Sequence, residues 1–389
     1  MKYLYGLKQA GYHWQRNITA FLLSKQFCRL TTDENVFIFR QDDAFVALVL
    51  HVDDLLVVST SEQLRLDLIA ALRLHYGEIS LKSGAELPYL GLLLHINDQS
   101  VSITQPGLID KLGVLHLSSS SRRHPSTPLS VPSRIAQHSN TTVVDTPSVD
   151  SVSSLDYLAV VGGINYLTQF SRPDCYYALS VVAQKCSKPT RSDFNLCLRI
   201  LSYLIDTRHV QLTFNRATLR PIFYADAAFN CYPDARSHYG YVGCLAEGDG
   251  SFIVDSKRTT VTALSSTEAE IIGCCECIRT VVWVRRLLAE LGTPVSDPTI
   301  VYQDNMSTIQ WIQGHRNFRA SRHVNPKLHF AGDMIDTGEV ELRYLSTTQM
   351  VADILTKPLA APQHYALASQ LLNYQLRQLE SSTSSTHVE

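Results

Sequence analysis

Four carboxylate side chains in the second half of the chain have the types and settings that a metal-dependent reaction requires. Asp226 closes an apolar run, and Glu270 opens a long helical pattern. Asp304 follows a second strand-like run, whereas Asp353 lies in a short helical segment. Mg²⁺ prefers hard oxygen ligands, and two such ions roughly 3.5–4 Å apart activate a water and stabilise a leaving oxygen. If the four elements converge, the sequence predicts a two-metal site that hydrolyses phosphodiesters.

The segments between these acids predict the order strand, hairpin, helix, strand, helix, helix. Residues 239–254 give two short strands around a Gly-containing loop of hairpin length. Residues 265–268 match a capping box, which starts a helix running to about Leu291. The box gives Glu268 a structural task, while Glu270 lies about 200° further around the helix. We therefore assign the metal-ligating role to Glu270.

Each acid also has an ordinary structural explanation. Asp304 could cap a helix at 306–312, because Asp is a favoured N-cap residue. Asp226 could end its strand in a turn, and Glu270 could face water. Asp353 could be one solvated charge on a helix. Taken singly, each explanation competes with the catalytic one, but four acids in this order are far harder to obtain by accident.

Four motifs surround these acids: Tyr224-Ala225-Asp226-Ala227, Ser265-Ser266-Thr267-Glu268-Ala269-Glu270, Tyr302-Gln303-Asp304-Asn305 and Ala352-Asp353-Ile354-Leu355-Thr356-Lys357. With them, residues of about 217–364 resemble the ribonuclease H domain of copia-type retrotransposon polyproteins. Phe229 stands where that family usually has Trp, and Asn325 stands where it more often has an acid. The resemblance implies that two Mg²⁺ or Mn²⁺ ions are held by Asp226, Glu270, Asp304 and Asp353.

The first part of the chain contains two neighbouring carboxylates. An apolar strand, an acidic turn with Asp53 and Asp54, and another apolar strand follow one another, which places both acids at a hairpin tip. A polar turn is the structural alternative. With His51 in place of the usual Tyr, the turn resembles the Y-x-D-D turn of reverse transcriptases, and the match covers most of residues 3–105. It implies that Asp53 and Asp54 bind metal and that Gln9 lines the nucleotide pocket.

Two further motifs extend this resemblance. Leu4-Tyr5-Gly6-Leu7-Lys8-Gln9-Ala10 matches the segment before the polymerase palm, and Tyr89-Leu90-Gly91 matches the hairpin that grips the primer. The family carries a third polymerase carboxylate upstream of the first motif, whereas this sequence begins at Met1. Because two acids alone position two ions poorly, we expect the polymerase part to be inactive.

Composition divides the chain into five parts of a mixed α/β (α+β) fold. A stretch rich in Ser, Thr and Pro predicts a flexible linker. After it, helical apolar spacing broken at Pro173 and Pro189 resembles the connection between copia polymerase and nuclease. The expected parts are a partial reverse transcriptase with palm and primer-grip region (1–116), the linker (117–154), the helical connection (155–216), a ribonuclease H-like mixed sheet flanked by helices (217–364), and a C-terminal helix with a disordered tail (365–389).

The charge of the chain is almost balanced. A formal net charge of −2 over 389 residues gives no global basic field for nucleic acid, so phosphate contacts would come from a local cluster and would depend on salt. A solvated loop with incidental charge is the alternative. The cluster consists of His315, Arg316, Arg319, Arg322, His323, Lys327 and His329. The residues assigned to substrate binding are Gln9, Arg316, Arg319, Arg322, His323 and Lys327.

The nine cysteines do not form two C-x-x-C pairs of the zinc-site kind. Cys274, Cys275 and Cys277 crowd one predicted helix and are expected to pack as small, reduced apolar groups. The sequence shows no signal segment and no apolar run of roughly 18 residues that would span a membrane. These features predict an intracellular protein of the cytoplasm, the nucleus or a virus-like particle, which is not secreted.

The sequence therefore favours a retroelement polyprotein segment whose active part is a ribonuclease H. Its expected partners are an RNA–DNA hybrid, primer–template nucleic acid and other retroelement Pol products, without a membrane. The RNA strand would be recognised by its 2′-hydroxyl groups across the shallow minor groove. Two alternatives stay open: a non-catalytic nucleic-acid-binding remnant of a decayed element, and a polymerase that obtains its third Asp from another chain.

Overall fold

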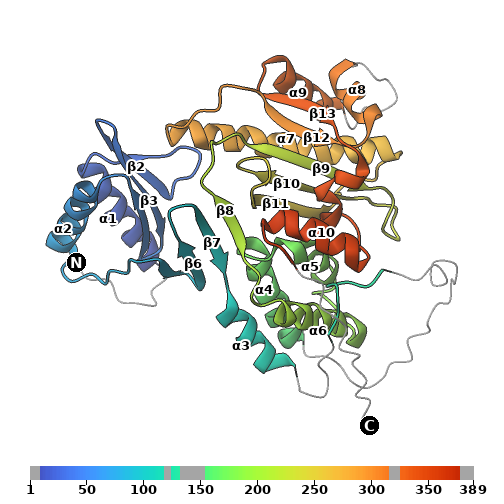
Figure 1. The fold of residues 1–389 in the computed structure, drawn as a ribbon, viewed down its shortest axis with the longest axis horizontal. Helices are drawn as coiled ribbons and strands as arrows, with labels where there is room; N and C mark the ends of the chain where they lie inside the picture. The colour runs from blue at the N-terminus through green and yellow to red at the C-terminus, as the bar shows by residue number, and fades with distance from the viewer. Residues whose placement is uncertain (1–8, 118–123, 132–153, 315–324, 377–389) are drawn as a thin grey trace, which may run out of the picture. The chain divides into compact units, whose positions relative to one another are not determined.

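The computed structural model describes residues 9–117, 124–131, 154–314 and 325–376 (Figure 1). The chain divides into two compact units, of which unit 1 contains Met1–Ser83 and Thr280–Ser296, and unit 2 contains Gly84–Arg279 and Asp297–Glu389. The boundary after Ser83 falls inside the expected polymerase part (1–116). The domain limits expected from the sequence stay predictions. Most of the expected linker and tail lies outside the described residues.

Unit 1 is built on an antiparallel sheet in which each strand pairs with the next one in sequence, in the order β1-β2-β3-β4. Apolar residues of the sheet and of two helices form its core, among them Ile18, Leu22, Phe37 and Leu48. The predicted strand, acidic turn and strand are confirmed by the pairing of β3 with β4. The elements are α1 (Ala10–Ser24), β1 (Cys28–Arg29), β2 (Val36–Gln41), β3 (Ala44–His51), β4 (Asp54–Ser59) and α2 (Glu62–Tyr76).

The first part of unit 2 combines a small antiparallel sheet, in the order β5-β6-β7-β8, with a cluster of helices. Leu90 and Gly91 have positive φ angles, 48° and 74°, and form the two-residue turn of the predicted hairpin. The predicted helical spacing and its breaks are confirmed by α4, α5 and α6. The elements are β5 (Glu86–Tyr89), β6 (Leu92–Ile96), β7 (Ser100–Thr104), α3 (Pro106–His116), α4 (Ser154–Phe170), η1 (Pro173–Cys175), α5 (Tyr176–Ala183), α6 (Arg191–Asp206) and β8 (Leu212–Asn215).

The second part of unit 2 is a mixed sheet in the order β11-β10-β9-β12-β13. Strands β9, β10 and β11 are antiparallel neighbours, whereas β12 runs parallel to both β9 and β13. Helices α8 and α9 lie against β12 and β13, and η3 packs on β9 and β10 (Figure 1). The elements are β9 (Ile222–Ala228), β10 (His238–Cys244), β11 (Ser251–Arg258), α7 (Ser266–Glu290), β12 (Thr299–Gln303), α8 (Met306–Gly314), α9 (Asn325–Asp336), β13 (Val340–Tyr344), η2 (Thr347–Gln349), η3 (Val351–Leu355) and α10 (Ala361–Leu372). The part of α7 from Thr280 onwards is counted with unit 1.

This succession confirms the mixed fold class and contains the predicted strand, hairpin, helix, strand and two helices in that order, with η3 as the helix that carries Asp353. Helix α9 and strand β13, which precede η3, were not predicted. The C-terminal helix, expected from residue 365, begins at Ala361 instead. Pro362 stands in its first turn, where the missing N–H needs no partner. Strand β8 and helix α10 share an apolar core with the mixed sheet, through Leu212, Val242 and Leu371. The connection and the expected nuclease part are therefore joined by one core.

All nine cysteines are free thiols, and Cys274, Cys275 and Cys277 are buried, as the sequence predicted. Burial raises the pKa of the Cys275 thiol to about 12, so this thiol stays protonated at neutral pH. Among the described residues, no helix is both long and apolar enough to cross a membrane.

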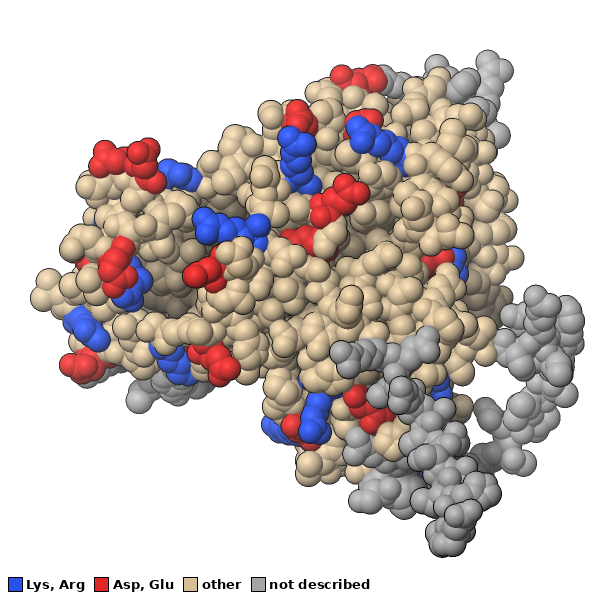
Figure 2. Space-filling view, in the orientation of Figure 1, with Lys and Arg blue, Asp and Glu red and all other residues tan. Residues whose placement is uncertain are grey.

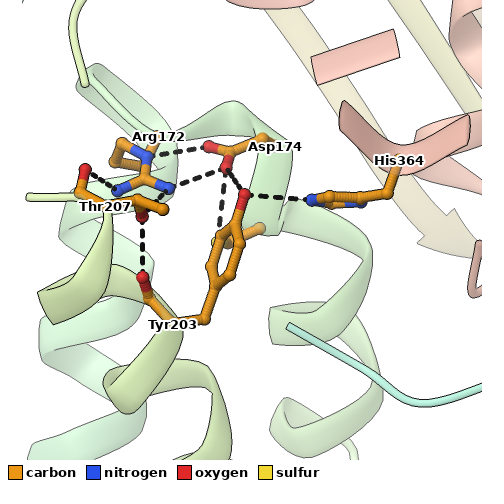
Figure 3. Close-up of polar contacts among 6 residues, drawn as sticks. Arg172, Asp174, Tyr203, Thr207 and His364 are labelled. Atoms are coloured by element: carbon orange, nitrogen blue, oxygen red, sulfur yellow. Dashed lines mark hydrogen bonds and ion pairs between the residues drawn. The ribbon is translucent and has the colours of Figure 1, made fainter. Parts of the chain in front are cut away.

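A buried ion pair holds the helical cluster together (Figure 3). Arg172 is 1 % exposed and donates to both carboxylate oxygens of Asp174, at 3.0 and 2.8 Å. The guanidinium also donates to the carbonyl and hydroxyl oxygens of Thr207. The Tyr203 hydroxyl donates to Asp174 at 3.0 Å and lies 3.1 Å from Nε2 of His364 on α10. The network thus links η1, α6 and α10.

We expect Arg172→Met to lower the free energy of unfolding of unit 2 by about 3–5 kcal/mol, because Asp174 would stay buried without its cation. Urea denaturation followed by circular dichroism measures this loss. Arg343→Met is the matched control, since the pair that Arg343 forms with Glu341 is exposed and exposed pairs contribute little. Equal losses in the two variants would contradict the structural role of the buried pair.

Candidate active site

Three carboxylates from three different elements converge beside the mixed sheet. Asp226 lies within β9, Glu270 in the first turns of α7, and Asp304 directly after β12. One oxygen atom from each of the three lies within 4.8 Å of the other two. In the part of the chain that the structure describes, no other three His, Cys, Asp or Glu side chains come together in this way.

The parallel pairing of β9 with β12 places Asp226 and Asp304 at corresponding positions of neighbouring strands. Tyr302 of β12 lies opposite Tyr224 of β9. Asp304 and Asp226 each follow two residues later, and residues two apart on a strand project from the same face. The register of one strand pair therefore brings these two carboxylates together.

Glu270 reaches them because α7 comes very close to the sheet at Gly273. A Cβ atom at Gly273 would lie 3.0 Å from Cβ of Tyr239 and 3.5 Å from the carbonyl oxygen of Asp226. Glu270 stands three residues before Gly273 and so shares its helix face. A larger residue at position 273 would push the helix, and the Glu270 carboxylate with it, away from the strands.

Gln303 connects two of the acids. Its amide nitrogen donates to Glu270 at 3.3 Å, and its amide oxygen accepts from the backbone N–H of Asp304 at 2.7 Å. The side chain of Gln303 is fully buried, so these bonds fix it. The sequence analysis did not single out Gln303, although it lies in the quoted motif directly before Asp304.

Burial and the neighbouring carboxylates make the ionised forms of Glu270 and Asp226 unfavourable. Burial, followed by the charges of Asp226 and Asp304, holds the pKa of Glu270 well above its usual range. Burial also raises the pKa of Asp226, against the opposing charge of Lys357. A cation held among the three would relieve both effects. Three hard carboxylate oxygens at this spacing fit a divalent ion such as Mg²⁺.

The fourth expected ligand, Asp353, lies near the three but outside their 4.8 Å group. It is 1 % exposed, and its Oδ1 lies 2.8 Å from Nζ of Lys357. Burial, and then the charge of Asp226, raises the pKa of Asp353 to about 6. The hydroxyl of Thr356 donates to Asp226. The sequence analysis did not single out Thr356 or Lys357, although the four-residue spacing of Asp353 and Lys357 is typical of a helical ion pair.

The structure contradicts the ordinary explanations of the four acids. The helix after Asp304 is capped by Asn305, whose Oδ1 accepts from the N–H of Thr308 at 3.2 Å. Asp226 does not end its strand in a turn, because β9 continues to Ala228. Glu270 is 7 % exposed and so does not face water, and the buried Asp353 is not a solvated charge.

The predicted task of Glu268 is confirmed with one difference. Ser265 Oγ accepts from the N–H of Glu268 at 3.2 Å, as in a capping box. The Glu268 carboxylate accepts from the N–H of Leu264 at 2.6 Å, one residue before Ser265, which the motif did not predict. Glu268 therefore caps the N-terminus of α7. Glu270 is the acid of this helix that faces Asp226 and Asp304.

The two carboxylates of the first part lie at a hairpin tip, as predicted. Strands β3 and β4 pair up to His51 and Asp54, and Val52 in the turn has a φ of 54°. Asp53 and Asp54 are exposed. Neither forms a group of three metal-ligating side chains with other described residues. Gln9, expected to line the nucleotide pocket, is exposed and directly precedes α1.

Most of the predicted basic cluster lies outside the described residues, namely His315, Arg316, Arg319, Arg322 and His323. Of the two described members, His329 is exposed on α9, and Nζ of Lys327 lies 2.5 Å from Glu276 on α7. On the face that Figure 2 shows, basic and acidic side chains of the described residues are interspersed. Contact with phosphate groups by the cluster stays a prediction.

Sequence comparisons find similarity to retroelement proteins along most of the chain. Residues 1–115 match the family model described as reverse transcriptase (RNA-dependent DNA polymerase). The retrovirus-related Pol polyprotein from transposon RE2 of Arabidopsis thaliana is 27 % identical over 363 residues, which cover 92 % of this chain and 24 % of that protein. The Pol polyprotein from transposon TNT 1-94 of Nicotiana tabacum is 27 % identical over 360 residues, with coverages of 92 % and 26 %.

Some solved structures also align with parts of the chain. An N-terminal RNase H domain from Mycobacterium tuberculosis is 14 % identical and has a TM-score of 0.28, with 39 % of this chain and 97 % of that one covered. The native protease–reverse transcriptase of prototype foamy virus is 12 % identical and has a TM-score of 0.26, with 40 % and 20 % covered.

The sequence matches make the chain similar to retroelement proteins, with residues 1–115 similar to reverse transcriptases and 92 % of the chain similar to a Pol polyprotein. More particularly, these matches support a segment of a copia-type retrotransposon Pol polyprotein, as the sequence motifs indicated. It spans about a quarter of the length of the plant relatives that it matches.

Proposed function

We propose that the chain carries a ribonuclease H centre that hydrolyses the RNA strand of an RNA–DNA hybrid. The convergence of Asp226, Glu270 and Asp304 within 4.8 Å of one another carries this proposal. These three residues would hold divalent cations, with Asp353 beside them. When bound there, Mg²⁺ or Mn²⁺ supplies positive charge that activates a water and stabilises the leaving oxygen.

Neutral side chains orient the ligating carboxylates. Gln303 donates to Glu270, the hydroxyl of Thr356 donates to Asp226, and the hydroxyl of Thr347 donates to Asp304 at 2.8 Å. Each acid thereby keeps one fixed hydrogen bond and has further lone pairs for a cation. Such orientation reduces the reorganisation that cation binding requires.

The purified 389-residue protein should cleave the RNA strand of a labelled hybrid when Mg²⁺ or Mn²⁺ is present and should stop when a chelator is added. The reason is that the carboxylates alone offer no positive charge to the scissile phosphate. Gel analysis of the end-labelled RNA measures cleavage, and duplex DNA of the same sequence serves as the substrate control. Binding of the hybrid without cleavage under either ion would support the non-catalytic alternative instead.

We also expect this polypeptide to be unable to extend a primer on an RNA template. Among the described residues, Asp53 and Asp54 have no third carboxylate close enough to complete a two-metal site. Primer extension with labelled nucleotides measures this under the conditions used for the cleavage assay. Extension by the purified protein would show that its polymerase part is active.

A further inference from the structure

A buried chain of hydrogen bonds runs from a loop after β9 to the helix that carries Asp353. The hydroxyl of Tyr232 lies 2.7 Å from Nδ1 of His238, and Nε2 of the same ring lies 2.8 Å from Oγ of Ser256. Ser256 Oγ donates to the carbonyl oxygen of Leu355 at 2.6 Å. His238, on β10, is fully buried, and Ser256, on β11, is nearly so. The chain therefore crosses two strands and ends on η3.

The chemistry of these groups fixes the direction of every bond. Ser256 donates its only hydroxyl hydrogen to the carbonyl oxygen of Leu355, so its own oxygen must accept from Nε2–H of His238. Nδ1 of His238 then carries no hydrogen and accepts from the hydroxyl of Tyr232. Burial lowers the pKa of His238 to about 4, which agrees with the neutral ring that this arrangement needs.

The end of the chain is close to the carboxylates in sequence and in space. Leu355 is the last residue of η3, two places after Asp353 and directly before Thr356. Thr356 donates to Asp226, and Asp353 pairs with Lys357. The orientation of the Leu355 carbonyl group therefore affects the positions of Asp353 and Thr356, which lie beside the three converging acids.

A short 3₁₀ helix depends on such outside contacts. Its hydrogen-bond geometry is poor, and η3 contains only five residues. Apolar packing brings the segment onto the sheet, where a Cβ atom at Gly240 would lie 2.5 Å from Cβ of Leu355. Apolar packing is less directional than a hydrogen bond. The hydrogen bond from Ser256 is directional and restricts the rotation of η3, in addition to the contact of Thr356 with Asp226.

We propose that His238 is a positioning residue of this centre. Acting through Ser256, it fixes the carbonyl of Leu355 and thereby holds Asp353 and Thr356 in place beside Asp226. The proposal rests on the proposed ribonuclease H function, although its structural part can be measured without cleavage. His238 itself contacts none of the reacting groups.

Four variants of the 389-residue protein test this role. His238→Leu and Ser256→Ala should each lower kcat for hybrid cleavage by about 10–100-fold, the range found when supporting contacts of a metal site are removed, with KM nearly unchanged. The double variant should be no worse than the single ones, because both break the same chain. His238→Gln should recover much of the rate, since its amide can still donate to Ser256.

Hydrogen exchange gives a second measurement that needs no catalysis. The amides of Asp353 and Thr356, which are bonded within the turn, should exchange faster in His238→Leu and Ser256→Ala than in the wild type. Ser202→Ala is the matched control, because Ser202 is equally buried and donates to the carbonyl of Leu198 in the helical cluster. It should change neither kcat nor exchange in η3.

The two proposals fail in different ways. If the wild type does not cleave the hybrid, the proposed function fails, and the exchange rates alone decide whether His238 orders η3. If His238→Leu and Ser256→Ala exchange and cleave like the wild type, the positioning role is overturned. It is also overturned if Ser202→Ala lowers kcat as much as Ser256→Ala does.

Discussion

Asp304→Asn is expected to lower the rate of hybrid cleavage about a thousandfold while the protein stays folded. An amide offers an oxygen of similar shape without the negative charge that holds a divalent cation, and a loss of about 4 kcal/mol in transition-state stabilisation corresponds to that factor. The fold should persist because the amide oxygen can still accept from Thr347, as the Asp304 carboxylate does at 2.8 Å. Initial rates with saturating Mg²⁺ measure the effect.

Asp98→Asn is the control for this substitution, because Asp98 is an exposed residue of the turn between β6 and β7. It should cleave like the wild type. Thermal melting should show both variants folded. Cleavage by Asp304→Asn at the wild-type rate would rule out the assignment of the three converging acids to the metal site.

Glu270→Gln and Glu268→Gln are expected to have opposite consequences, although the two residues are only two positions apart. Glu270 faces Asp226 and Asp304, so its loss of charge should again reduce cleavage about a thousandfold. Glu268 accepts the N–H of Leu264 at the start of α7, which a Gln side chain can also do. Glu268→Gln should therefore keep nearly full activity, and it serves as the matched control for Glu270→Gln.

The melting temperature separates these roles without a catalytic assay. Since burial and repulsion raise the pKa of Glu270, its ionised form destabilises the metal-free protein at neutral pH. Glu270→Gln should thus melt at a higher temperature than the wild type in chelator and gain less from added Mg²⁺. Should Glu268→Gln be the inactive variant, the ligating role would move to Glu268.

Much of the local structure was predictable because it depends on neighbours in sequence. Alternating apolar residues and turn residues predicted the hairpin that carries Asp53 and Asp54, and the capping motif predicted where α7 begins. The same spacing rules separated Glu268 from Glu270, since a helix places residues two apart on different faces. The structure also gives Glu268 a hydrogen bond from the N–H of Leu264, which the motif alone does not specify.

By itself, the sequence determined the chemical types of the acids, the type of element that carries each of them and the resemblance to copia-type Pol polyproteins. Only the tertiary structure decided which groups meet. The register of β9 with β12 and the close approach of α7 at Gly273 bring three acids together, while Asp353 stays outside and pairs with Lys357. The tasks of Gln303 and His238 also depend on partners from other elements. The spacing of apolar residues in the sequence indicates which face of a helix or strand is buried. The distances between side chains of different elements depend on contacts between residues far apart in sequence.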